Sequence, residues 1–95
     1  MMTSKERAKL RSLASVEPAI LQVGKLGIND SVIRSAAEAL EARELVKMSV
    51  LDNSGLAARD AAEEIAEKTG AAVVAVIGSK FILYKKKEKD SKYGI

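Results

Sequence analysis

The sequence has no cysteine and no histidine, and its 95 residues include one proline and only three aromatic side chains. Without cysteine, disulfide frameworks and thiolate zinc sites are excluded. Without histidine, the chain lacks the commonest general base near neutral pH and the commonest metal ligand. It also cannot build a serine–histidine catalytic relay. These absences predict a protein that is not an enzyme, has no catalytic residues, no small-molecule substrate, and no metal or other cofactor.

Long apolar runs are absent too. No stretch reaches the roughly 18 residues that a membrane-spanning helix requires, so no membrane partner is expected. The charged start, MMTSKERAKLR, lacks a following apolar segment and cleavage site, which argues against a signal peptide. A cysteine-free chain of this kind suits the cytoplasm. The oligomeric state stays open, with a monomer favoured.

The length suits one compact domain, which we place at residues 1–86, with a charged and mobile tail at 87–95. Charge is unevenly distributed along the chain. Residues 1–11 carry a net charge of +3 and residues 80–95 of +4, whereas residues 12–79 carry −4. If the fold brings the two ends together, they form one positive patch on an acidic body. The alternative is that the terminal lysines only promote solubility.

Hydrophobic periodicity predicts seven elements in the order α-β-α-β-α-β-β. They are a helix over 4–14, a strand over 19–23, a helix beginning near Asn29, a strand over 45–51, a helix over 56–68, and strands over 71–77 and 80–86. Strand–helix–strand units favour parallel neighbours, and the final hairpin adds an antiparallel strand. The expected fold class is therefore α/β, a mixed four-stranded sheet packed against helices. The continuous apolar run 71–77 indicates a strand that is covered on both faces or lies in mid-sheet.

Local signals support these elements. Thr3 and Glu6 have the spacing of a capping box, and Gly70 is suited to end the third helix. That helix should present an acidic, solvated face made of Asp60, Glu63, Glu64 and Glu67.

The stretch Gly24-Lys25-Leu26-Gly27 lies between a predicted strand and a predicted helix. Glycines allow positive φ and close approach of another backbone, while the free N–H groups of the following helix favour an anion. Lys25 adds a full positive charge. The KH module clamps a nucleic-acid backbone with a similar Gly-x-x-Gly loop. The alternative is that the glycines only form a turn.

Basic side chains outside the loop extend the candidate RNA surface. They are Lys5, Arg7, Lys9 and Arg11 in the first helix, and Lys80, Lys85, Lys86 and Lys87 at the hairpin. Tyr84 either stacks on a base or belongs to the core or sheet edge. Lys47 is either an exposed sheet residue or part of a basic face. With so few aromatics, contacts to the RNA backbone and shape should dominate over base readout.

Four stretches in order, MTSKERAKLRSLA, VGKLGIND, ALEARELVKMSVL and VIGSKFILYKK, resemble the YhbY family over about residues 3–86. This family is the stand-alone form of the CRM (chloroplast RNA splicing and ribosome maturation) domain. The resemblance implies an RNA-binding domain associated with precursors of the large ribosomal subunit. It also implies a fold similar to the C-terminal domain of translation initiation factor three, and RNA contact at Gly24, Lys25, Leu26 and Gly27. Family members commonly have arginine where this chain has Lys85, which keeps the charge but not the bidentate fork.

The leading hypothesis is therefore a ribosome-assembly protein that binds structured ribosomal RNA or a pre-large-subunit particle. A protein-interaction module that docks its basic ends on an acidic ribosomal or assembly-factor surface is the alternative. An enzyme acting on RNA is a third hypothesis, for which the sequence offers no catalytic group.

Overall fold

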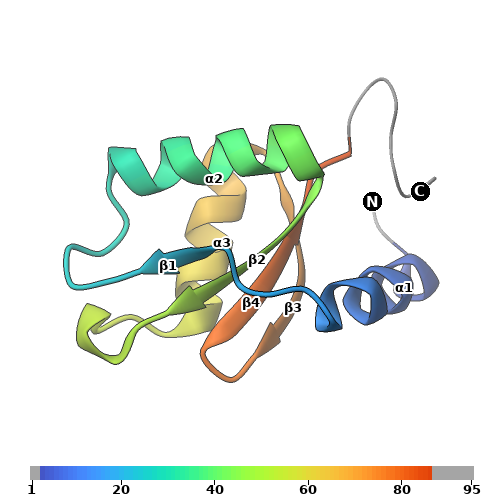
Figure 1. Cartoon of the computed structure of the whole chain (residues 1–95), viewed down its shortest axis with the longest axis horizontal. Coiled ribbons are helices and arrows are strands. Elements are labelled where there is room, and N and C mark those ends of the chain that lie inside the picture. Colours follow the sequence, from blue (N-terminus) through green and yellow to red (C-terminus); the bar gives the residue numbers. More distant parts are fainter. Residues whose placement is uncertain (1–2, 87–95) are drawn as a thin grey trace.

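The computed structural model describes residues 3–86, and Figure 1 shows their arrangement. The elements are α1 (Ser4–Ser15), β1 (Leu21–Val23), α2 (Asp30–Arg43), β2 (Leu45–Val50), the short 3₁₀ turn η1 (Asp52–Ser54), α3 (Ala58–Thr69), β3 (Ala72–Ile77) and β4 (Lys80–Tyr84). This confirms the predicted α/β class, element order and mixed four-stranded sheet. The tail predicted for 87–95 lies outside the described residues.

The four strands lie side by side in the order β1-β2-β4-β3. β1 and β2 run parallel, while β4 is antiparallel to both β2 and β3. The last strand in sequence is thus inserted between β2 and β3, and Phe81, Ile82, Leu83 and Tyr84 are all buried there. The alternative that placed the strand over 71–77 in mid-sheet is wrong, because β4 takes that position and leaves β3 at the edge. The other alternative, cover on both faces, is correct: α1 and α3 both pack against β3.

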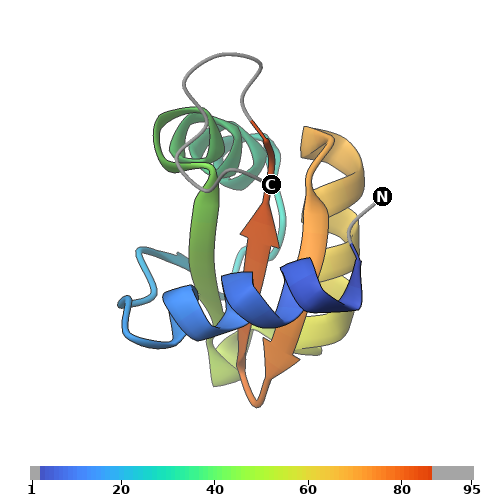
Figure 2. The same cartoon turned by 90° about the vertical axis from the view of Figure 1, so that its right-hand side faces the viewer.

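Helices cover the two faces of the sheet unequally. α2 and α3 lie on one face and α1 crosses the other alone (Figures 1 and 2). Alternation along β2 sends Val46, Met48 and Val50 into the larger apolar cluster beneath α2 and α3. Leu45 joins the smaller cluster, in which Leu10 of α1 packs on the sheet. We call these two sides the α2/α3 face and the α1 face.

The capping box and the helix end predicted from the sequence are both present. The Thr3 hydroxyl accepts from the Glu6 N–H at 3.1 Å, and the Glu6 carboxylate accepts from the Thr3 N–H at 2.9 Å, which completes the capping box. Asn29 caps α2 by accepting from the Val32 N–H at 3.0 Å. Gly70 ends α3 with φ of 77°, as predicted.

The end of α2 has a feature that the sequence analysis missed. Glu44 terminates the helix with φ of 65°, although positive φ favours glycine. Its side chain is fully buried, and the Tyr84 hydroxyl donates to its Oε2 at 3.3 Å. Tyr84 is therefore a core residue, and its buried ring is not available to stack on a base.

Some boundaries differ from the predicted ones. β1 begins at Leu21 and β4 ends at Tyr84, so both strands are shorter than expected. α3 begins at Ala58, after η1. The Ser54 hydroxyl accepts from the Leu56 N–H at 3.1 Å and holds the chain in a turn there, which delays the helix.

Candidate nucleic-acid interface

The Gly24–Gly27 loop forms a tight turn in which the Gly27 N–H donates to the Gly24 carbonyl at 2.9 Å. Gly27 has φ of 70°, a conformation that favours glycine, whereas Gly24 does not have positive φ. A Cβ at Gly24 would lie 3.6 Å from Cδ1 of Leu51, an ordinary contact. Only the second glycine is thus required by the turn. Lys25 and Leu26 are exposed at its tip.

Hydrogen bonds place this loop at the same end of the sheet as the β3–β4 turn. The Leu51 N–H donates to the Val23 carbonyl at 2.9 Å, and the Val50 N–H donates to the Ser79 carbonyl at 2.7 Å. Lys80 begins β4 at this end and is exposed. We call Gly24–Gly27 together with Lys80 the loop group. The acidic residues Asp30 and Asp52 begin α2 and η1 at the same end, so the loop group is not a strongly positive patch.

The four basic residues of α1 form a second group on the α1 face. Lys5, Arg7, Lys9 and Arg11 are all exposed, because Leu10 and Ala14 supply the buried side of the helix. Arg7 and Arg11 line a groove of about 430 Å³ between α1 and β3. Among residues 3–86 the one ion pair is Lys68–Glu64, so none of these four side chains is held in an ion pair with a carboxylate of that part of the chain.

The hairpin lysines do not gather at one place. Lys85 follows the opposite end of β4 from Lys80, about 17 Å away at the usual rise of a strand. Its ammonium donates to the Thr69 carbonyl at 2.9 Å, at the C-terminal end of α3. Lys86 acts on α1. Hydrogen bonds from Thr3 lower the pKa of Glu6 in that helix, and the positive charge of Lys86 adds a smaller lowering. Lys87 lies outside the described residues.

Lys47 lies between the two groups. It pairs with Ile82 across the β2–β4 ladder, and Ser49 pairs with Lys80, so Lys47 and Lys80 are diagonal neighbours. Alternation puts both on the α1 face with Ile82. The long axis of the molecule measures 36 Å, and the Gly24–Gly27 loop and α1 lie towards opposite ends of the view in Figure 1. The Gly24–Gly27 loop and the α1 group therefore lie apart, with Lys47 and Lys80 on the sheet face between them.

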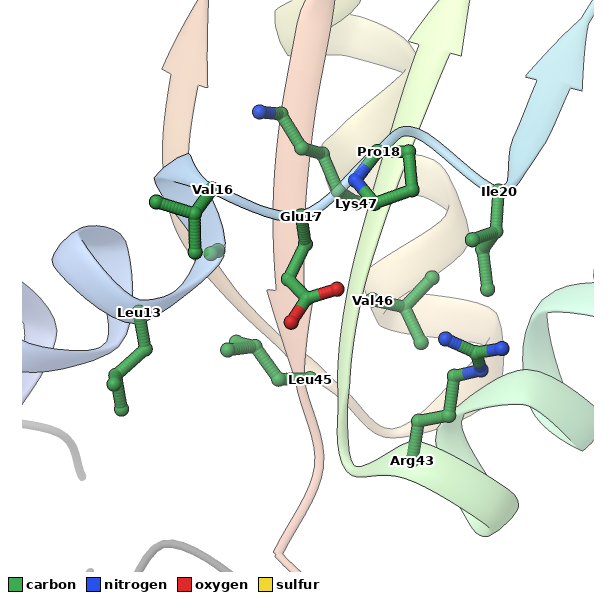
Figure 3. A pocket seen from close by; sticks show the side chains of 10 residues that line it. Leu13, Val16, Glu17, Pro18, Ile20, Arg43, Leu45, Val46 and Lys47 are labelled. Carbon is green, nitrogen blue, oxygen red and sulfur yellow. The ribbon is translucent and has the colours of Figure 1, made fainter.

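A pocket of about 270 Å³ opens beside the C-terminal end of α1 (Figure 3). Leu13, Pro18, Ile20 and Leu45 supply apolar walls. Glu17 and Arg43 extend into it from opposite sides, while the amine of Lys47 points away from both. Neither Glu17 nor Arg43 was expected at a site from the sequence. Glu17 lies in the α1–β1 linker and Arg43 at the end of α2, and no local pattern indicates that folding places them at one pocket.

Two other features are absent from residues 3–86. No cluster of three or more acidic, histidine or cysteine side chains in this part of the chain is arranged to hold a metal ion. No helix within it has the length and apolar character needed to cross a membrane.

Comparison with known proteins adds independent information. Residues 2–85 match the model of the CRS1/YhbY (CRM) domain. A Bacillus subtilis (strain 168) protein named "Probable RNA-binding protein YqeI" is 43% identical over 90 residues, covering 95% of this chain and 94% of the relative. The solution structure of Staphylococcus aureus SAV1595, described as "a putative RNA binding protein", superposes with a TM-score of 0.77 at 36% identity, covering 96% and 95% of the two chains. The chain therefore belongs to the CRS1/YhbY (CRM) domain family.

Proposed function

We propose that this protein binds RNA, and that its target is structured ribosomal RNA in precursors of the large ribosomal subunit. Family membership and the names of the Bacillus subtilis and Staphylococcus aureus proteins support RNA as the partner. The ribosomal target rests on the resemblance to the YhbY family.

One structural observation favours the α1 face as the RNA-binding side. The basic α1 group, Lys47 and Lys80 all belong to this face. The outer surface of α3, across the sheet, carries Asp60, Glu63, Glu64 and Glu67. Because a phosphate backbone is attracted to the first surface and repelled by the second, charge alone orients the RNA.

The described residues favour contacts to the RNA backbone. Phe81 and Tyr84 are both buried, so neither offers a stacking platform of the kind an RNA-recognition sheet displays. Exposed lysine and arginine side chains contact phosphates without reading sequence. In this proposal the loop group and the α1 group hold two separate parts of one structured RNA.

The loop contribution is tested by titrating ribosomal RNA at several salt concentrations with the wild type and Lys25→Gln. If Lys25 contacts a phosphate, the slope of log affinity against log salt should fall by about one. Lys68→Gln is the matched control, because Lys68 is exposed on α3 and paired with Glu64. It should leave the slope unchanged. A wild-type slope in Lys25→Gln would mean that the loop is only a turn.

The ribosomal target is tested by co-sedimentation with large-subunit precursors, with and without nuclease. Association through RNA should be lost after nuclease treatment. Association that survives would favour the alternative, docking on an acidic protein surface.

A further inference from the structure

We propose that the pocket beside the C-terminal end of α1 binds one unstacked guanine base of the RNA. This inference rests on the proposed RNA-binding function and names a base that the protein reads. It concerns residues that belong to neither the loop group nor the α1 group.

The size and walls of the pocket suit a single planar ring system. At about 270 Å³, it is close to the lower limit of roughly 300 Å³ for small-molecule sites. Leu45 and Val46, from opposite faces of β2, are the buried residues of β2 that line it, whereas Val16 is 85% exposed. Such a site has room for one base against its aliphatic side chains.

The charges of Glu17 and Arg43, both exposed to solvent, favour a ligand that carries both donors and acceptors. Glu17 and Arg43 reach into the same space from opposite sides (Figure 3), yet they form no ion pair within the described chain. A lone phosphate would be attracted by Arg43 and repelled by Glu17. A group with donors on one edge and acceptors on an adjacent edge would satisfy both side chains.

Guanine carries two neighbouring donors on one edge and two neighbouring acceptors on the adjacent edge. Its N1–H and N2–H groups are neighbouring donors for the two oxygens of Glu17. Its O6 and N7 atoms are neighbouring acceptors for the guanidinium fork of Arg43, the commonest specific contact to this base. Adenine presents an acceptor at N1, which the carboxylate would repel, and the pyrimidines lack N7.

The surroundings of the pocket fit a nucleotide inserted from bound RNA. Lys47 lines the same pocket, but its amine points away from Glu17 and Arg43 (Figure 3). It can therefore meet the phosphate of a nucleotide whose base lies inside. RNA-binding proteins commonly read bases that are splayed out of loops and bulges in this way.

Four short RNA hairpins, identical except for one unpaired nucleotide, test the proposal with the full chain. The hairpin with unpaired guanine should bind at least about fivefold more tightly than those with adenine, cytosine or uracil. Glu17→Gln should abolish this preference. It should leave binding of the other three hairpins unchanged or tighter, because it removes a negative charge.

Two further variants complete the test. Arg43→Gln should also lose the guanine preference, while Glu41→Gln, on the exposed surface of α2, should keep it. Equal affinity for all four hairpins, with Glu17→Gln tightening all of them equally, would overturn the pocket and leave RNA binding intact. A guanine preference that persists in Glu17→Gln would also overturn it. Failure of every hairpin and of ribosomal RNA to bind would instead refute the proposed function.

Discussion

The two faces of the sheet differ in how completely they are covered. On the α2/α3 face, two helices seal a cluster that contains Val23, Leu40, Met48, Ile65 and Phe81. On the α1 face, a single helix covers the smaller cluster around Leu10 and Ile82. The uncovered part of that face carries Lys47 and Lys80, and the pocket beside α1 lies where this face meets the end of α2.

The α2/α3 face therefore contributes more to the stability of the fold, and the α1 face offers more surface for a ligand. A sealed face contributes buried apolar area, and its outer surface is left with the acidic stripe of α3. A partly covered face buries less, but it leaves cations and a pocket accessible to a ligand. The same four strands thus support a structural side and an interaction side.

The largest effect should come from damaging the sealed face. Phe81→Ala removes a fully buried ring and should lower the free energy of unfolding by about 3–5 kcal/mol. Leu10→Ala, on the α1 face, should cost less, about 2–3 kcal/mol, because a single helix can settle over the gap. Urea denaturation measures both. Equal losses would show that the two clusters contribute alike.

A smaller effect, on RNA affinity, should come from removing charges. Removing arginines from the α1 face should weaken binding, whereas removing glutamates from α3 should not. Arg7→Gln with Arg11→Gln should weaken RNA binding by up to about 100-fold in 0.1 M salt, since two phosphate contacts contribute about two powers of salt concentration. Glu63→Gln with Glu67→Gln, on α3, should not weaken it. Filter binding measures both affinities, and comparable losses would contradict an RNA-binding α1 face.

The smallest effect concerns the start of α1. Thr3→Ala removes the capping box and should cost about 1 kcal/mol of stability. Because hydrogen bonds from Thr3 lower the pKa of Glu6, Glu6 stabilises the folded state above its unfolded pKa. That contribution is lost as the pH falls through the lower, folded pKa. In Thr3→Ala the pKa of Glu6 should rise only part of the way towards its ordinary value in an NMR titration, because the backbone N–H of residue 3, the larger cause of the lowering, is kept. An unchanged pKa would mean that the Thr3 hydroxyl does not contribute to the lowering.

Features set by neighbouring residues were predictable from the sequence. The capping box at Thr3 and the helix end at Gly70 depend on a few consecutive residues, and the structure has both. The strand order was not predictable, because Leu45 pairs with Tyr84 and Ser49 with Lys80 across long stretches of chain. Glu44 was missed because the residue expected at positive φ after a helix is glycine or asparagine.

The candidate site was predictable in its parts and not in its layout. The loop and the basic residues of α1 have the predicted local structure, and charge can be read from composition. Whether Lys80 and Lys85 lie together depends on where β4 begins and ends, and the structure separates them. That Glu17 and Arg43 line one pocket depends on the path of the α1–β1 linker to β1, where the Ile20 N–H donates to the Lys47 carbonyl at 2.9 Å.

The central position of β4 has a consequence for folding during synthesis. β2 and β3 do not pair with each other, so until residue 84 has left the ribosome the sheet is divided, with two open strand edges. Phe81 and Leu83 complete the larger cluster only then. Pairing over such sequence distances is slow, and open edges promote aggregation. This protein should therefore reach its native state only after translation of β4.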